Sequence, residues 1–107
     1  MSRLALVNGR VLTDRGIEEG LAVLVEDGRI AAVTTSHQAL QRADDAHDLR
    51  GATLLPGFID CQVNGGGGVL FNNDTSVEAI AAIGRAHRRF GTTGFLTTLI
   101  SDDAEVM

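Results

Sequence analysis

Residues 56–68 read PGFIDCQVNGGGG, an apolar run that begins at a proline and ends in two amides and four glycines. The apolar side chains have no helical spacing, and Pro56 fits the start of a strand because proline cannot donate to a strand ladder. We therefore predict a strand from Leu54 to Val63. A mostly apolar strand of this kind is typical of a parallel sheet that is buried on both faces.

The residues after the glycines predict a helix and a second strand. Thr75 stands three residues before Glu78, the spacing of a capping box, so we expect a helix over Ser76–Phe90. Its expected buried face consists of Val77, Ile80, Ala81, Gly84 and His87. Gly91 fits the left-handed residue that follows a helix, and Gly94–Ile100 is predicted as the second strand.

The order strand, helix, strand predicts one βαβ unit with parallel strands. Ser101, Asp102 or Asp103 is placed to cap a further helix. Two parallel strands leave open edges and more apolar surface than one helix covers. We therefore expect an N-terminal fragment, in which residues 54–107 begin a (β/α)8 barrel of the TIM type that is incomplete in this chain, since a whole barrel has roughly 250 residues.

The first half of the sequence predicts short antiparallel strands. Asn8-Gly9 and Asp27-Gly28 each separate two apolar runs, and such pairs favour a type I′ hairpin because both residues accept a positive φ. We assign residues 1–53 to a small β-rich domain, a portion of a β-sandwich, and we assign no structure to residues 34–49. The expected fold class is therefore α/β, a β-sandwich portion followed by the start of the barrel.

Composition limits the class of protein. Of the 107 residues, 44% are hydrophobic and 21% are charged, as in one soluble globular domain. A net charge of -5 argues against binding to nucleic acid or to an anionic membrane surface. No apolar run approaches the roughly 18 residues of a spanning helix, and the first residues do not form a signal peptide. Cys61 is the only cysteine, so no internal disulfide is possible and the expected location is the cytoplasm.

Two stretches resemble a known family of enzymes. After a β-rich start, LLPGFID at residues 54–60 resembles the amidohydrolase superfamily, whose members usually continue Asp-x-His-x-His with two metal-binding histidines. Here Asp60 is followed by Gln62 and Asn64 in place of these histidines. The Gln-x-Asn-Gly sequence with its glycine run, together with FGTTGFLTTLISDD at residues 90–103, resembles the N-acetylglucosamine-6-phosphate deacetylase family.

This resemblance implies an activity for the full-length protein. It implies metal-dependent hydrolysis of the N-acetyl group of N-acetylglucosamine 6-phosphate, which gives glucosamine 6-phosphate and acetate in amino-sugar catabolism. It also implies one divalent metal per chain, zinc or iron, and a homodimer. The family's metal ligands and catalytic aspartate come from later strands, so we expect no catalytic residue and no metal ligand in this chain, which should be inactive alone. The alternatives are another amidohydrolase acting on a cyclic amide or an acylated sugar, and a catalytically dead scaffold relative.

The two amides keep the geometry of the superfamily's histidines. Side chains two residues apart on a strand point to the same side, but a carboxamide oxygen is a poorer ligand for zinc or iron than imidazole. We therefore place Gln62, Asn64, Gly65 and Gly66 near the metal or the substrate, with the amides bonded to the metal-bound water or to the substrate. Two other interpretations remain open: the amides satisfy backbone groups at the strand end, and the glycines form a plain turn.

Three further polar side chains lie near this motif. We expect Asp60 to bond the neighbouring backbone rather than to act as an acid or base. Cys61 should point away from Gln62 and be buried as a small apolar side chain. His87 is expected on the helix surface or in packing, and not as a ligand.

Overall fold

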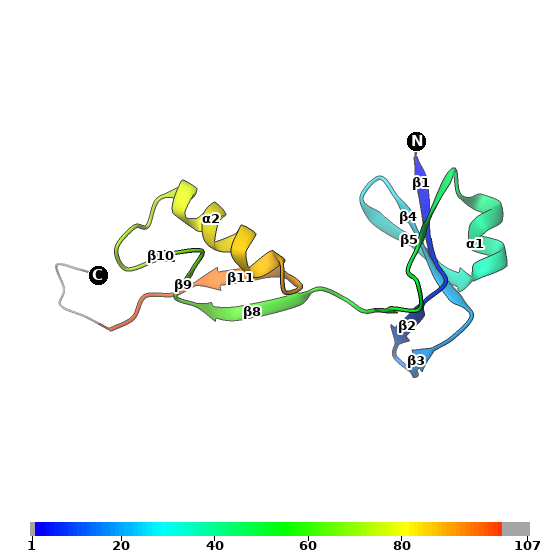
Figure 1. The fold of residues 1–107 in the computed structure, drawn as a ribbon, viewed down its shortest axis with the longest axis horizontal. Helices are drawn as coiled ribbons and strands as arrows, with labels where there is room; N and C mark the ends of the chain where they lie inside the picture. The colour runs from blue at the N-terminus through cyan, green and yellow to red at the C-terminus, as the bar shows by residue number, and fades with distance from the viewer. Residues whose placement is uncertain (1, 102–107) are drawn as a thin grey trace. The chain divides into compact units, whose positions relative to one another are not determined.

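The computed structural model describes residues 2–101 of the chain. The chain divides into two compact units, Met1–Pro56 and Gly57–Met107, whereas the sequence analysis placed a boundary between residues 53 and 54. Each unit combines strands with one helix, so the fold is mixed α/β and consists mostly of strands (Figure 1). Neither helix in the described range is long and apolar enough to cross a membrane.

The first unit contains a four-stranded sheet in the order β5-β4-β1-β6. Its strands are β1 (Arg3–Val7), β4 (Leu21–Glu26), β5 (Arg29–Thr35) and β6 (Asp45–Asp48). β1 pairs antiparallel with β4 and parallel with β6, so the sheet is mixed rather than purely antiparallel. Helix α1 (Ser36–Arg42) covers one face, and the core beneath it consists of Ala5, Ala22, Leu24 and Ala39.

A smaller sheet in the order β3-β2-β7 completes the first unit. β2 (Arg10–Thr13) pairs antiparallel with β3 (Gly16–Glu18) and parallel with β7 (Thr53–Leu54). The predicted Asn8-Gly9 hairpin is therefore wrong. Asn8 has a φ of 61°, but Gly9 has no positive φ, as a type I′ turn would require. The Arg10 amide instead donates to the Ala52 carbonyl at 2.9 Å, which directs the chain into the second sheet.

The Asp27-Gly28 hairpin is confirmed. The two residues have φ angles of 52° and 74° between paired Glu26 and Arg29, and they join β4 to β5. The region that received no structure, residues 34–49, contains both α1 and β6. Thr35 caps α1 by accepting the Gln38 amide at 3.2 Å, and only one residue of this short helix is buried.

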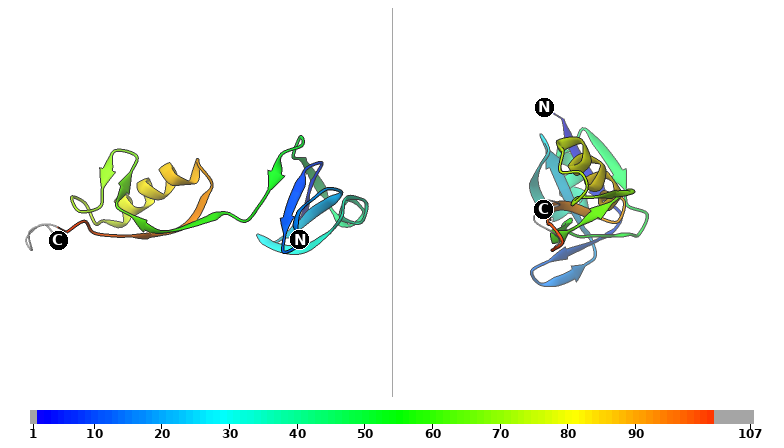
Figure 2. Two further views of the ribbon diagram at one scale, coloured as in Figure 1. Left: turned by 90° about the horizontal axis from the view of Figure 1, so that it is seen from below. Right: turned by 90° about the vertical axis from the view of Figure 1, so that its left-hand side faces the viewer.

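The second unit has the predicted order strand, helix, strand. β8 (Phe58–Val63) pairs in parallel with β11 (Thr92–Thr97), and α2 (Val77–Arg88) connects them. β8 begins later than predicted, because residues 53–54 belong to β7 of the first unit. β11 begins at Thr92 rather than at the predicted Gly94. Figure 2 shows α2 along one face of the strand pair. Gly84 of α2 faces the Phe95 ring, which a side chain on Gly84 would meet at 2.9 Å.

The prediction that β8 is buried on both faces is not met in this chain. Phe58 and Ile59 are 56% and 76% exposed, and only Val63 of the strand is buried. Cys61 is exposed too, so its predicted burial is wrong here. The physical reason is that α2 covers one face of the strand pair, and the described residues supply no second layer.

The predicted cap of α2 is wrong by one residue. Ser76, not Thr75, is the N-cap, and its hydroxyl accepts the Ala79 amide at 3.1 Å. Asp74 accepts the Ser76 amide at 3.0 Å and holds that residue at the cap position.

The predicted buried face of α2 is met only in part. Ala79 and Ile83 are buried, whereas Val77 is 77% exposed and Ala81 is exposed too. Ile80, Gly84 and His87 of the predicted face are half-buried. The further helix cap expected at Ser101, Asp102 or Asp103 reaches outside the described residues, which end at residue 101.

Candidate functional site

The glycine run after β8 is a tight hairpin. β9 (Gly65–Gly66) pairs antiparallel with β10 (Val69–Leu70). Gly67 and Gly68 form the turn with φ angles of 60° and 82°. Two consecutive positive φ angles are the requirement of a type I′ turn, which favours glycine at both positions.

The first two glycines allow close backbone approach within the chain itself. A side chain on Gly65 would collide with the Val69 carbonyl oxygen across the hairpin. A side chain on Gly66 would lie 2.9 Å from Nε2 of His87. The glycine run therefore has a conformational role in the fold, and close approach of a substrate stays a prediction.

Asn64 connects the end of β8 to the end of β11. Its Oδ1 accepts the Thr98 hydroxyl at 2.6 Å, and the Thr98 amide donates to the Val63 carbonyl at 2.9 Å. The Asn64 carbonyl also accepts the Phe71 amide at 2.8 Å. The carboxamide oxygen thus accepts one hydrogen bond, and within residues 2–101 the Asn64 NH2 group has no hydrogen-bond partner. This amide therefore has both donors free to bind another group.

Gln62 lies two residues earlier and has an exposed side chain. Its backbone amide donates to Asp60 Oδ1 at 3.0 Å, so the prediction that Asp60 bonds the neighbouring backbone is confirmed. Side chains two apart on a strand share a side, which places the Gln62 amide on the side of Asn64. Asn64, Gly65 and Gly66 thus follow one another at the end of β8, where Asn64 bonds Thr98 and the two glycines pair with β10. The Gln62 side chain is exposed at the same strand end.

Sequence reasoning missed two polar residues of this region. Asn72 is 7% exposed, and its amide bonds the Ile100 backbone in both directions, donating to the carbonyl at 2.8 Å and accepting from the amide at 2.7 Å. Thr98 is the donor to Asn64 described above. Neither contact could be predicted from the sequence. The bonded residues are about thirty positions apart in each case, and no local pattern relates them.

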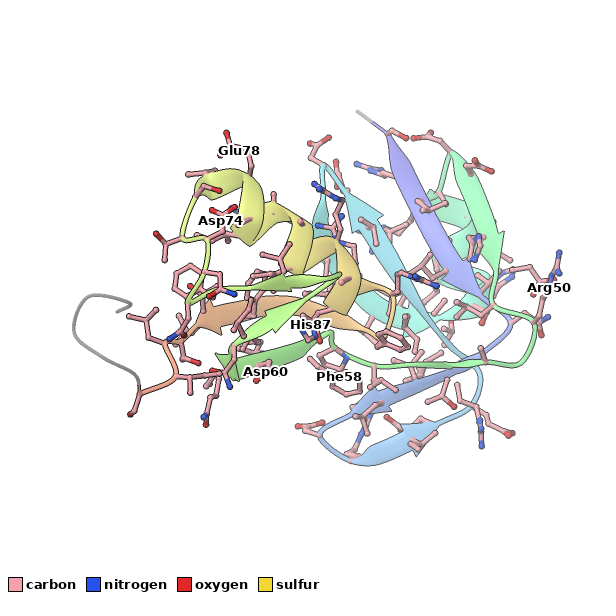
Figure 3. All side chains as sticks on the ribbon, turned by 60° about the vertical axis from the view of Figure 1, so that its left-hand side comes forward. Arg50, Phe58, Asp60, Asp74, Glu78 and His87 are labelled. Atoms are coloured by element: carbon pink, nitrogen blue, oxygen red, sulfur yellow. The ribbon has the colours of Figure 1, made fainter. Side chains whose placement is uncertain are left out.

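His87 also contributes to this region. Its Nε2 lies 2.9 Å from the Gly65 carbonyl oxygen, and the side chain projects from α2 toward the strands beneath it (Figure 3). The expectation of a packing role agrees with this contact. No group of three or more His, Cys, Asp or Glu side chains in the described part of the chain could hold a metal. A neutral carboxamide such as that of Asn64 is also a poor ligand for zinc or iron, so these residues alone do not fit a metal centre.

Two carboxylates have shifted acidities. Hydrogen bonds from the Ser76 side chain and backbone hold the pKa of Asp74 below its usual range. The Arg50 backbone amide and the Asn8 side chain likewise lower the pKa of Asp48. Both groups are exposed and stabilise local turns, so neither is suited to proton transfer at neutral pH.

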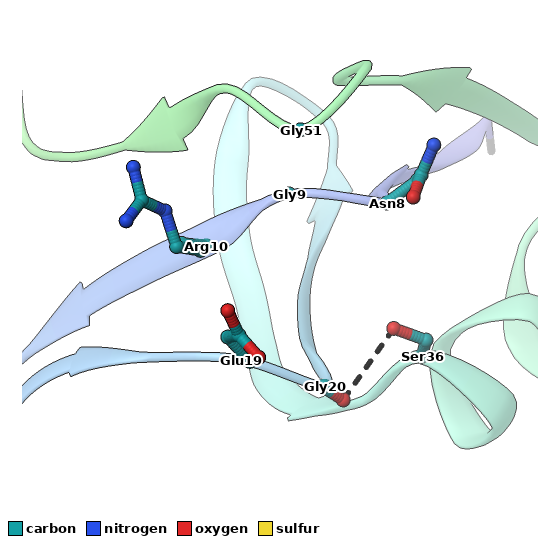
Figure 4. Close-up of a pocket in the computed structure, with 7 residues that line it drawn as sticks. All are labelled: Asn8, Gly9, Arg10, Glu19, Gly20, Ser36 and Gly51. Carbon is teal, nitrogen blue, oxygen red and sulfur yellow. Dashed lines mark hydrogen bonds between the residues drawn. The ribbon is translucent and has the colours of Figure 1, made fainter.

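The first unit has an open cavity of about 430 Å³ (Figure 4). No binding site was predicted there from the sequence. Its lining residues are Asn8, Gly9, Arg10, Glu19, Gly20, Ser36 and Gly51. Arg10 and Glu19 supply charges of both signs. The Ser36 hydroxyl lies 3.4 Å from the Gly20 carbonyl oxygen.

Comparison with known proteins identifies relatives. No family model matches the chain. It is 46% identical over 99 residues to an N-acetylgalactosamine-6-phosphate deacetylase of Shewanella sp. (strain ANA-3). It is 35% identical over 99 residues to an N-acetylglucosamine-6-phosphate deacetylase of Haemophilus influenzae. These alignments cover 92% of the chain and 25% and 26% of the two relatives.

A solved structure gives the same result. The crystal structure of N-acetylglucosamine-6-phosphate deacetylase from Pasteurella multocida matches with a TM-score of 0.88 and 34% identity. The match covers 98% of this chain and 27% of the other. The chain thus spans about a quarter of the length of the relatives that it matches.

Proposed function

Because this chain is homologous to a part of the N-acetylglucosamine-6-phosphate deacetylases of the amidohydrolase superfamily, we propose that the full-length protein deacetylates N-acetylglucosamine 6-phosphate. Water supplies an oxygen to the acetyl carbon, the carbon–nitrogen bond breaks, and the nitrogen leaves with a proton. The products are acetate and glucosamine 6-phosphate. The observation that carries the proposal is the match of 98% of this chain to such an enzyme.

We propose that the two units belong to two domains. The first unit, which includes β7, is a portion of a β-sandwich, and the second unit begins a (β/α)8 barrel. The exposed apolar side chains of the strand pair support the barrel, since Phe58, Ile59 and Leu96 need a covering layer. In a barrel, the groups that act on substrate lie at the C-terminal ends of the strands. Asn64 and the glycine hairpin follow the C-terminal end of β8.

Within that site, Gln62 and Asn64 act as hydrogen-bond donors. The Asn64 oxygen accepts from Thr98, and the NH2 group can donate to a substrate oxygen or to a bound water. We propose that residues outside this segment hold one divalent metal per chain, zinc or iron. Such a metal, when bound, lowers the pKa of a coordinated water. Gln62 and Asn64 then orient the oxygen atoms of the reacting groups, with Gly65 and Gly66 beside them.

Metal content tests this role of the amides. In the full-length protein, Gln62→Ala should leave the metal bound and lower kcat, because it removes a donor near the reacting atoms and no ligand. We expect a loss of roughly tenfold or more in kcat. Loss of the metal from this variant would make Gln62 a ligand. If both the rate and the metal content stay unchanged, the amides have only a structural role at the end of the strand.

N-acetylgalactosamine 6-phosphate is a second candidate substrate. The relative at 46% identity is named for this sugar, and the relative at 35% for the gluco epimer. Acetate release from both sugar phosphates by the full-length protein decides between them, with unphosphorylated N-acetylglucosamine as control. Activity on neither sugar phosphate would contradict the proposal. Hydrolysis of a cyclic amide instead would favour another amidohydrolase, and binding without turnover would favour a scaffold.

The setting of the full-length protein is proposed as well. We propose a cytoplasmic homodimer that acts on a small phosphorylated amino sugar. The chain's net charge of -5 supports the absence of nucleic acid and anionic membrane among its partners. Size-exclusion chromatography with light scattering on the full-length protein measures the oligomeric state.

A further inference from the structure

We propose that His87 is a positioning residue that fixes the glycine hairpin, and through it Asn64, at the C-terminal end of β8. This inference deepens the deacetylase function proposed above and rests on it for its catalytic consequence. The hairpin carries Gly65 and Gly66, which directly follow Asn64. His87 lies in the last turn of α2, the helix that packs against this hairpin.

The hydrogen bond of His87 defines which nitrogen carries a proton. Nε2 lies 2.9 Å from the Gly65 carbonyl oxygen, and a carbonyl oxygen only accepts. Nε2 must therefore be the donor, so neutral His87 is the Nε2–H tautomer. The imidazole is half-buried, which protects this bond from competing water. It joins two segments 22 residues apart in the sequence.

Packing around this bond leaves no space for other side chains. A Cβ on Gly66 would lie 2.9 Å from His87 Nε2, and a Cβ on Gly67 would lie 3.3 Å from the Ala86 Cβ. The hairpin therefore lies directly on the last two turns of α2. Gly66 lies outside the two-residue turn and serves this contact, and Gly65 avoids a clash with the Val69 carbonyl oxygen, so the glycine run is longer than the turn.

The hairpin is the part of the chain that transmits this contact to Asn64. The Asn64 carbonyl accepts the Phe71 amide at 2.8 Å, just beyond β10, so Asn64 is bonded to the far end of the hairpin. Its side chain is held separately by Thr98 at 2.6 Å. Asn64 is thus fixed from two directions, by Thr98 just after β11 and by α2 through His87 and the hairpin. Removing His87 takes away the hydrogen bond between α2 and the hairpin.

Two substitutions at His87 in the full-length protein test the role. His87→Leu removes the donor, whereas His87→Gln keeps an N–H group at a similar distance from the backbone. We expect His87→Leu to lower kcat by about tenfold to about a hundredfold because Asn64 is displaced, with metal content and KM close to wild type. His87→Gln should restore most of the rate. His37→Leu is the matched control, because His37 is an exposed helix histidine in the first unit.

Hydrogen exchange and NMR test the contact without relying on activity. The amides of residues 65–71 should exchange faster in His87→Leu and return toward wild type in His87→Gln. Selective ¹⁵N-histidine labelling should show His87 as the Nε2–H tautomer. Equal exchange in the leucine variant and wild type, an Nδ1–H tautomer, or equal loss of kcat in both His87 variants would overturn the inference. Wild-type protein inactive on both sugar phosphates would overturn the deacetylase proposal and the catalytic consequence, while exchange still decides the contact.

Discussion

The two units of the chain are stabilised in different ways. In the first, Ala5, Ala22 and Leu24 are fully buried beneath α1, so a small apolar core closes one side of the sheet. In the second, β8 is largely exposed, and the C-terminal end of the strand pair carries side-chain hydrogen bonds from Asn64 and Asn72. Polar contacts therefore hold this end, whereas the described residues leave apolar side chains of β8 uncovered. A binding site needs side chains that are held by such contacts.

Isolating the 107-residue chain should give the largest effect. We expect no metal-dependent acetate release, and we expect the amides of β8 and β11 to exchange nearly as in an unfolded chain, because so little of the strand pair is buried. The amides of β1 and β4 should exchange more slowly. Hydrogen exchange by mass spectrometry measures both. Equal protection of the two units would remove the contrast between them.

Core truncation in the full-length protein is the next test. Leu24→Ala should cost about 3 kcal/mol of unfolding free energy because the side chain is fully buried. If the barrel covers β8 as proposed, Ile59→Ala should cost about 2 kcal/mol or more, despite its exposure in this chain. Urea denaturation measures both variants. A negligible cost for Ile59→Ala would show that β8 faces solvent and would contradict the barrel.

The cap of α2 should give a smaller effect. Ser76→Ala removes the acceptor of the Ala79 amide and should cost about 1 kcal/mol. Thr75→Ala is the matched control on the neighbouring hydroxyl, and it should change the unfolding free energy little. Thermal unfolding of the two full-length variants distinguishes them. A larger loss of stability in Thr75→Ala than in Ser76→Ala would show that Thr75 is the cap.

The dependence of stability on acidic pH, through Asp74, should show the smallest effect. Because Ser76 lowers the pKa of Asp74 in the folded protein, the carboxylate stabilises the fold above its unfolded pKa. That contribution disappears as the pH falls through the folded pKa. Asp74→Asn should therefore be less stable than wild type at neutral pH, and the two should converge in acid. Urea midpoints across this pH range measure the difference, and a difference independent of pH would exclude the carboxylate.

Local signals in the sequence predicted local structure well. The Asp27-Gly28 hairpin follows from the φ angles of two adjacent residues, and the βαβ order follows from periodicity. The cap of α2 was misplaced because Thr75 and Ser76 are adjacent hydroxyls, and the Asp74 side chain decides between them. Helix α1 was missed because it buries only Ala39, which leaves almost no apolar pattern.

Pairings between distant residues could not be predicted. Asn8-Gly9 carries a strong hairpin signal, yet β1 pairs with β6 and β2 with β7, which come much later in the sequence. In the candidate site, the amides and glycines were assigned from the resemblance of their motif to a known family, and that assignment stays a prediction, whereas the partners Thr98 and His87 were not predicted at all. Each depends on the return of the chain from α2 or β11, and three-dimensional neighbours of this kind leave no trace in a local pattern.

The central place of β1 has a consequence for biosynthesis. β1 lies between β4 and β6, and Leu4 pairs with Asp45, about 40 residues later. At ribosomal rates this partner is made roughly 2 to 8 seconds after β1. During that interval one edge of β1 is unpaired and can recruit another nascent strand. Slower translation lengthens this period. The yield of soluble protein should therefore depend on the elongation rate and on chaperones that bind the unpaired edge of β1.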